Sequence, residues 1–345
     1  MRVLARCLLT TLALAVVALA LPQRASAWNA VGHMTVAKLA FSMLTPDEQQ
    51  RLTAILAEHP HYGQYLSAAK PDEFAAGEWA VMRAGVWSDW IRPPRRLEGN
   101  PATHATYRFH RGPWHYVNFA YAAKQPQATL PDEPLGAATD ILRQLPLCAE
   151  FAGSTTKVDP DVEPEITAAQ NRAVRVCWLI HLIGDLHQPL HAATLVDERR
   201  LPGPHHEDQG GNLLAVRVEI GAYPIKLHAF WDQILGTDNH PASIARLADS
   251  LQHDPTLTAA KLPELQTAPT FRDWTAESYA IAKQWVYLDG ELPTLVWNDQ
   301  RPPLPPVDDV PILPVGYERD ARQAARKRIV LAAHRLAAQL SAAVK

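Results

Sequence analysis

Apolar positions recur with a helical period over most of the chain. Residues three or four apart share one face of a helix, so this spacing predicts helices with one buried side. At 45–48, Thr-Pro-Asp-Glu is a typical helix start, in which Thr45 is the cap and Glu48 lies three residues on. Other predicted helices are 31–44, 78–91, 135–145, 164–188, 271–287 and 317–344, and the very apolar 164–188 is the expected central helix.

One segment has the two-residue alternation of a β-strand. Residues 213–220 alternate and are rich in β-branched side chains, and 223–227 follow after Gly221 and Ala222, which predicts a β-hairpin. No internal repeat or low-complexity tract is evident. The pattern predicts a mainly all-α fold, with a single helical domain at 28–345 and a small β-hairpin. Loops are expected where proline, glycine, aspartate and histidine gather, at 93–113, 152–163, 197–211 and 291–314.

The first 27 residues have the pattern of a secretory signal peptide. Arg2 and Arg6 give a positive start, an apolar run reaches Leu21, and Ala-Ser-Ala at 25–27 fits a cleavage site. The alternative is a buried N-terminal helix. Cleavage makes Trp28 the first residue and predicts an exported protein, periplasmic or secreted. No later segment has the roughly 20 apolar residues of a membrane span, so no membrane insertion is expected after cleavage.

Charge and cysteine content narrow the classes of protein. The formal net charge is -3 and the sequence pI is about 6.6, which argues against a duplex-wrapping protein with a basic surface. An enzyme whose positive charge comes from metal ions is not excluded. Cys7 leaves with the signal peptide, and the remaining pair, Cys148 and Cys177, predicts a disulfide in an exported protein. The alternative is two buried free thiols.

Two pairs of histidine and aspartate, each spaced four residues apart, carry the strongest chemical signal. His181 and Asp185 share one helix face, a proline then ends the helix, and His191 follows. The second pair is His228 and Asp232 in KLHAFWD. Imidazole and carboxylate are usual ligands of zinc. A single pair is more often a packed core histidine, but two pairs and a flanking histidine predict a metal site.

Three further segments carry candidates that, taken singly, are more often structural. His33 follows Trp28 in WNAVGH, where a histidine can cap or pack. Asp89 ends an apolar helix in WSDWIR, where it can pair with Arg92. His115 stands in the aromatic segment WHY, as a core histidine would. Only their combination with the two pairs makes them candidates for function.

The motifs W-x4-H, W-x-D-x-I-R, W-H-Y, H-x3-D-x5-H, G-G-N and L-H-x2-W-D, in this order, resemble the trinuclear zinc nucleases of fungi and plants. These single-strand-specific nucleases are also 3′-nucleotidases, and bacterial zinc phospholipases C share their helical fold. The resemblance runs from Trp28 to about Trp285, whereas 291–345 match only as a final helix. His187 does not belong to these motifs. We expect it either to contact a metal ligand without binding metal itself or to interact at the end of the helix.

The resemblance implies a zinc-dependent nuclease domain at 28–345 with three Zn²⁺ ions. By position, Asp89, His115, His181 and Asp185 would bind the first ion. Trp28, through its amine nitrogen and carbonyl oxygen, would bind the second with His33 and the shared Asp185. The ligands of the third ion would be His191, His228 and Asp232.

The resemblance also implies a reaction. It is the endonucleolytic hydrolysis of phosphodiester bonds in single-stranded DNA and RNA to 5′-phosphate products, by metal-activated hydroxide, with 3′-nucleotides as further substrates. Asp89 and Arg92 are the catalytic candidates, and Arg92 would neutralise phosphate charge. Tyr116 is either a stacking surface for an unpaired base or a packed core residue. Asn118 stands where the family usually has an aspartate that helps read the base, so it keeps hydrogen bonding without the charge. We expect a monomer.

Two other classes of protein stay open. A zinc phospholipase C, or another phosphodiesterase, would use the same trinuclear core. In those relatives the last ligand is usually glutamate. This chain has Asp232 at that position and Gly-Gly-Asn at 210–212, and both features resemble the nucleases more than the phospholipases. A non-catalytic exported zinc-binding protein would bind zinc but lose no function on replacement of Arg92.

Overall fold

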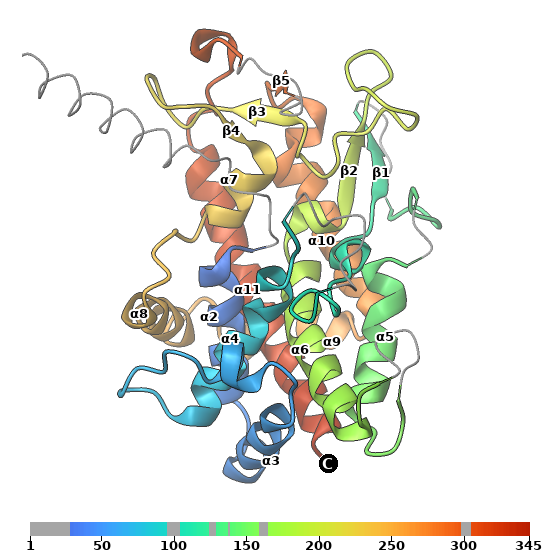
Figure 1. Ribbon diagram of the computed structural model, residues 1–345. Coiled ribbons are helices and arrows are strands. Elements are labelled where there is room, and N and C mark those ends of the chain that lie inside the picture. The colour runs from blue at the N-terminus through green and yellow to red at the C-terminus, as the bar shows by residue number, and fades with distance from the viewer. Residues whose placement is uncertain (1–27, 95–103, 124–128, 137–138, 159–164, 298–304) are drawn as a thin grey trace, which may run out of the picture.

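Four helices pack against one another at the centre of the molecule (Figure 1). The computed structural model describes residues 28–94, 104–123, 129–136, 139–158, 165–297 and 305–345, so the predicted signal peptide lies outside the described residues. In these ranges no helix is both long and apolar enough to cross a membrane. The central helices are α2 (Ala30–Ser42), α4 (Ala76–Trp90), α6 (Ala168–Leu186) and α11 (Tyr317–Ala343).

Helix α6 is the most enclosed of the long helices, as its apolar sequence predicts. Its first turn is closed by a capping box between Thr167 and Gln170, and every residue from Ala173 to Leu186 is buried. A helix that is apolar on all sides needs cover on all sides. Helices α2, α3, α4, α5 and α11 provide that cover, and α8 covers the outer side of α2. The outer helices are α3 (Pro46–Ala57), α5 (Ile141–Ala152) and α8 (Pro241–Gln252).

The short strands lie at one end of the bundle (Figure 1). Strands β1 (Phe119–Ala122) and β2 (Ala193–Val196) form a parallel pair with Phe119 opposite Ala193. Strand β3 (Leu214–Val216) lies between the antiparallel strands β4 (Ile225–Lys226) and β5 (Leu295–Val296). The remaining helices are α7 (Leu227–Gln233), α9 (Glu264–Thr267) and α10 (Phe271–Ile281), the π-helices Tyr62–Leu66 and Ala282–Val286, and the 3₁₀ turns Gly112–His115, Pro189–His191, Ala259–Lys261, Leu288–Gly290 and Val307–Asp309.

The mainly all-α fold with a small β-hairpin is confirmed, and the structure corrects several details. The hairpin has a third strand, β5, from a segment predicted as loop. The helix predicted at 135–145 begins only at Ile141, because Asp140 caps it through the Arg143 amide, and it continues to Ala152.

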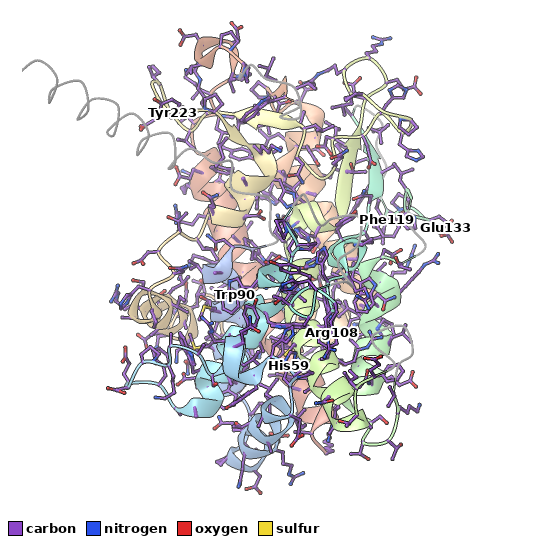
Figure 2. The ribbon with its side chains drawn as sticks, in the orientation of Figure 1. His59, Trp90, Arg108, Phe119, Glu133 and Tyr223 are labelled. Atoms are coloured by element: carbon purple, nitrogen blue, oxygen red, sulfur yellow. The ribbon has the colours of Figure 1, made fainter. Side chains whose placement is uncertain are left out.

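Tyr223 lies at the outer edge of the β3–β4 hairpin, far from Trp90 at the end of α4 (Figure 2).

The predicted disulfide between Cys148 and Cys177 is wrong, because both cysteines are free and fully buried. Cys148 lies on α5 and accepts a hydrogen bond from the Arg175 guanidinium at 3.4 Å. Burial raises the pKa of both thiols. They therefore pack as small apolar side chains where α5 meets α6, which was the alternative for this pair.

Candidate metal centre

The predicted ligand side chains come from separate elements and meet in three groups. Within each group the candidate ligand atoms lie within 4.8 Å of one another. The groups are His33, His181 and Asp185; Asp89, His115 and His181; and His191, His228 and Asp232. Because the first two groups share His181, the structure brings five of these side chains into one continuous cluster.

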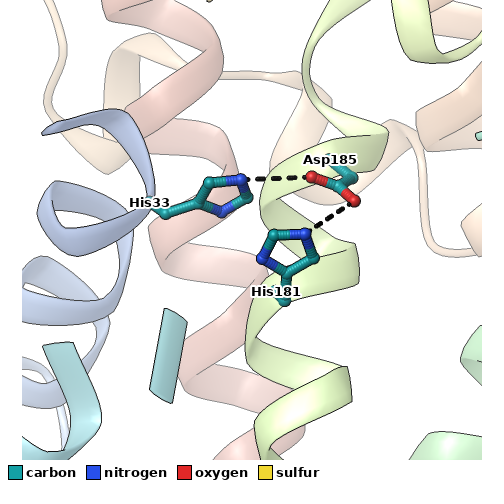
Figure 3. Close-up of side chains that lie close together, drawn as sticks. All are labelled: His33, His181 and Asp185. Carbon is teal, nitrogen blue, oxygen red and sulfur yellow. Dashed lines mark ion pairs between the residues drawn. The ribbon is translucent and has the colours of Figure 1, made fainter. Parts of the chain in front are cut away.

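Asp185, in the last turn of α6, is the centre of this cluster. Its Oδ1 lies 3.2 Å from Nε2 of His33 on α2 (Figure 3). Its Oδ2 lies 3.0 Å from both His181 Nε2 and His115 Nδ1. Burial alone would raise the pKa of Asp185, but the charge of His181 and the hydrogen bonds of the three imidazoles hold it well below its usual value. The carboxylate is therefore ionised and offers both oxygens as ligands.

The His181 ring is oriented so that its second nitrogen faces the cluster. Its Nδ1 donates to the Gly85 carbonyl of α4 at 2.8 Å, so the neutral form that binds a metal has its lone pair on Nε2. Without a metal the ring is protonated, because the effect of burial is outweighed by Asp185 and Asp89, which raise the pKa of His181 to about 9. That Nε2 lies 2.9 Å from His115 Nδ1. Zinc binds imidazole nitrogen at about 2.0–2.1 Å, so tetrahedral ligand atoms lie about 3.3 Å apart. The donor separations of 2.9–3.2 Å in this cluster are close to that spacing.

His33 completes the cluster from the side of α2. Its ring stacks on the His181 ring with centroids 4.1 Å apart. Buried atoms without a hydrogen-bond partner gather here, and an unsatisfied buried polar group costs about 1–3 kcal/mol. A cation bound among these atoms would remove that cost. These atoms are Nδ1 of His33, Nε2 of His115, and the pair His33 Nε2 and Asp185 Oδ1, which lie 3.2 Å apart without the geometry of a hydrogen bond.

The third group has two imidazole nitrogens that face each other. His191 donates from Nδ1 to the His115 carbonyl at 2.6 Å, and His228 donates from Nδ1 to the Gly210 carbonyl at 2.6 Å. Both neutral rings therefore direct an Nε2 lone pair inward, and these two atoms lie 3.2 Å apart. Two facing lone pairs repel each other unless a proton or a cation lies between them. Asp232 Oδ2 lies 3.6 Å from His228 Nε2, and burial raises the pKa of this carboxyl well above its usual value.

Two further predicted residues lie beside these groups. Arg92 Nη2 lies 3.5 Å from Asp89 Oδ1, and the Arg92 side chain is 24% exposed, so the guanidinium reaches solvent next to the cluster. Trp28 is fully buried, and the next residue, Asn29, donates its backbone N–H to the Asp232 carbonyl at 3.2 Å. The start of the predicted mature chain thus lies next to the third group.

Comparison with known families agrees with this geometry. A sequence model of S1/P1 nucleases matches residues 28–345. The chain belongs to the S1/P1 nuclease family. Comparison with curated proteins finds no match. Membership of this family makes the protein a hydrolytic enzyme that acts on nucleic acid. The family is metal dependent, and the clustered imidazoles and carboxylates of this S1/P1 nuclease are suited to hold metal ions.

The structure of this S1/P1 nuclease also places the predicted substrate residues. The Tyr116 ring is 41% exposed next to His115, so it is not the packed core tyrosine of the alternative. Asn118 donates from Nδ2 to Glu207 Oε2 at 3.3 Å, a contact between distant segments that no sequence signal indicated. His187 caps the end of α6 and accepts from Arg335 on α11 at 2.8 Å, as expected for a helix-end partner.

Sequence reasoning missed three residues that shape this site. Gln188 donates from Nε2 to Asp232 Oδ1 at 2.8 Å and so orients a predicted ligand. His110 lies near Arg92 and His115. Burial, and to a smaller extent the charges of His115 and Arg92, lower the pKa of His110 to about 4. Gly184 lies inside α6, one residue before Asp185. A glycine inside a helix indicates that another group packs closely against it, so the sequence did carry a signal for this position.

We expect Gly184→Ala to displace His33 and to reduce the metal content. A Cβ atom at this position would lie 2.7 Å from His33 Nδ1 and 3.0 Å from its Cε1. Alanine favours a helix by about 1 kcal/mol over glycine, but overpacking a close contact costs about 1–3 kcal/mol, so the clash should dominate. Elemental analysis and thermal unfolding measure both effects. Gly63→Ala is the control, since nothing lies within 4 Å of a Cβ there, and full metal content in Gly184→Ala would contradict the prediction.

Proposed function

We propose that this S1/P1 nuclease is an exported, monomeric, zinc-dependent endonuclease that cuts single-stranded DNA and RNA to 5′-phosphate products. It would also remove phosphate from 3′-nucleotides. The observation that carries the proposal is the convergence of buried imidazole lone pairs and carboxylates in three groups. Family membership supports the phosphodiester substrate, and the signal-like segment at 1–27 supports export.

The donor set supports zinc as the metal. It consists of imidazole nitrogens and carboxylate oxygens at tetrahedral-type spacings, with unsatisfied atoms on His33, His115 and Asp185. The proposed holders follow the allocation that the family resemblance implies: Asp89, His115, His181 and Asp185 for one ion; Trp28, His33 and Asp185 for another; and His191, His228 and Asp232 for the third. All of these residues except Trp28 belong to the three observed groups. When bound, such ions activate water and stabilise the negative charge that develops on phosphate and leaving oxygen.

The side chains around the ions would bind and orient the substrate. Arg92, partly exposed beside Asp89, can contact two non-bridging phosphate oxygens at once because its guanidinium is planar and forked. Such a donor contributes about 10²–10³ in rate when aimed at developing charge. Tyr116 offers an exposed ring on which an unpaired base can stack. The Asn118 amide donates to Glu207, which leaves its carbonyl oxygen to accept from a base.

We expect single-stranded oligonucleotides to be cut about 10- to 100-fold faster than matched duplexes. Stacking on an aromatic ring contributes about 1–3 kcal/mol per base, and a duplex keeps its bases stacked on one another. The chain has a net charge of -3 and so lacks the overall basic charge that favours binding to duplex phosphates. Rates on matched substrates, with end analysis of the products, test this, and equal rates or 3′-phosphate ends would contradict it.

Two controls complete this experiment. Tyr116→Ala should raise KM on single strands about 10-fold, whereas Tyr223→Ala, which removes an 85% exposed ring at the outer edge of the hairpin, should change nothing. A parallel assay with phosphatidylcholine tests the phospholipase alternative. Cleavage of the lipid without cleavage of DNA or RNA would replace the proposed substrate.

A further inference from the structure

A buried carboxylate that the proposed reaction does not use lies behind the third group. Asp208 is fully buried, and its Oδ1 accepts from the Thr194 hydroxyl at 3.0 Å and from the Leu195 amide at 2.9 Å. Its Oδ2 accepts from the hydroxyl of the fully buried Tyr287 at 2.8 Å. Burial raises the pKa of Asp208 to about 6 against the effect of these donors. A carboxylate kept at such a cost is expected to do more than fill space.

The Asp208 network fixes the loop that orients His228. The Thr194 hydroxyl has one proton, which it donates to Asp208, so its lone pairs are free to accept from the Gly210 amide at 3.4 Å. Gly210 has a φ of 61°, and a Cβ there would lie 2.4 Å from the Leu190 carbonyl, so its backbone has little freedom. The Gly210 carbonyl then accepts from His228 Nδ1 at 2.6 Å.

The same network also holds the segment that carries His191. Strand β2 begins two residues after His191, and it contains both Thr194 and Leu195. The backbone amide of Asp208 in turn donates to the Leu195 carbonyl at 2.9 Å. One carboxylate thus ties the strand that follows His191 to the loop that orients His228, and the Nε2 atoms of those histidines lie 3.2 Å apart.

We propose that Asp208 is a positioning residue for the third metal site, setting the separation of His191 and His228 through Thr194 and Gly210. The inference rests on the proposed binding of zinc by His191, His228 and Asp232. It concerns affinity for the ion, because a ligand held at the wrong distance or in the wrong tautomer binds zinc less tightly. Tyr287 would serve the same purpose one step further away, by holding Asp208.

The test measures zinc bound per chain over a series of buffered free Zn²⁺ concentrations, together with thermal unfolding. Asp208→Asn should weaken binding of one ion about 10- to 100-fold and leave the other two unchanged. Thr194→Val, which removes the hydroxyl, should act in the same direction, and Thr194→Ser, which keeps it, should restore wild-type binding. Tyr287→Phe should weaken the same ion by less. Tyr279→Phe is the matched control, because that hydroxyl donates to the Ala120 carbonyl at 2.9 Å and not to Asp208.

A double variant shows whether Asp208 acts through His228. His228→Ala should lose the third ion, and adding Asp208→Asn should cause no further loss of zinc, because coupled residues are not additive. If Asp208→Asn and Thr194→Val lower only the unfolding temperature and keep all the zinc affinity, Asp208 is a packing residue and the proposal fails. If His228→Ala binds as much zinc as the wild type, the proposed third site fails instead, so the two failures are distinguishable.

Discussion

Asp185→Asn is expected to remove more than one metal ion and to lower nuclease activity by about three orders of magnitude or more. Three imidazoles approach the two oxygens of Asp185 within 3.2 Å, so in the proposed assignment this one side chain binds two ions. Asparagine keeps the volume but replaces one anionic oxygen with an N–H donor that cannot bind a cation. Loss of metal-derived charge stabilisation costs several kcal/mol in the transition state, and about 4 kcal/mol corresponds to a factor of 10³.

The measurement for Asp185→Asn is metal per chain by elemental analysis, together with cleavage of a single-stranded oligonucleotide. Asp140→Asn is the matched control, since Asp140 is a buried aspartate that caps α5 and asparagine caps a helix equally well. That control should keep its metal and its activity. Loss of a single ion from Asp185→Asn would show that the carboxylate serves only one site.

One alanine added before Trp28 is expected to abolish most activity and to remove one ion. A free α-amine has a pKa near 8, so a metal ion displaces its proton readily, whereas an amide nitrogen has its lone pair delocalised into the carbonyl. Asn29 bonds to the Asp232 carbonyl and its side chain donates to the Gly236 carbonyl at 2.6 Å, so residue 28 has little freedom to move away. Activity would therefore begin only when the signal peptide is removed.

The experiment compares a chain that starts at Trp28 with one that has the extra alanine. Adding one alanine after Lys345, which is exposed at the other end of the chain, controls for the change in length. Zinc content and single-strand cleavage are measured for all three proteins. Equal zinc and equal rates would contradict the amine-ligand hypothesis and leave Trp28 as a packing residue.

Spacing along one helix was enough to predict which residues share a face, but not which helices meet. His181 with Asp185 and His228 with Asp232 each lie on one face because a helix repeats every 3.6 residues. By contrast, the distance of His33 from Asp185 depends on α2 packing against α6 at Gly184, which local pattern does not contain. The resemblance to a known family supplied that long-range information.

The errors in the predicted fold have identifiable physical reasons. Strands β1 and β2 have only four residues each. Strand β1 alternates in burial but has the sequence FAYA, with no polar residue, and the first three residues of β2 are all buried, so neither shows an apolar–polar alternation in its sequence. Helix α8 is absent from the predicted set, although Pro241 in its first turn and the buried Ile244, Ala248 and Leu251 at three- and four-residue spacings were signals for it. The cysteine rule failed because Cys148 and Cys177 fill space between two helices instead of cross-linking them.

The candidate metal centre also joins parts of the chain that are far apart in sequence. Asn29, beside the first ligands, bonds to Gly236, 207 residues away. A cross-link that closes a loop of about 100 residues lowers the entropy of the unfolded chain by the equivalent of about 4.7 kcal/mol. Bound ions would act as such cross-links in a protein whose two described cysteines are free. Resistance to proteases and catalytic competence would then be acquired in the same event, so a chain that failed to obtain its metal would be degraded instead of persisting as an inactive enzyme.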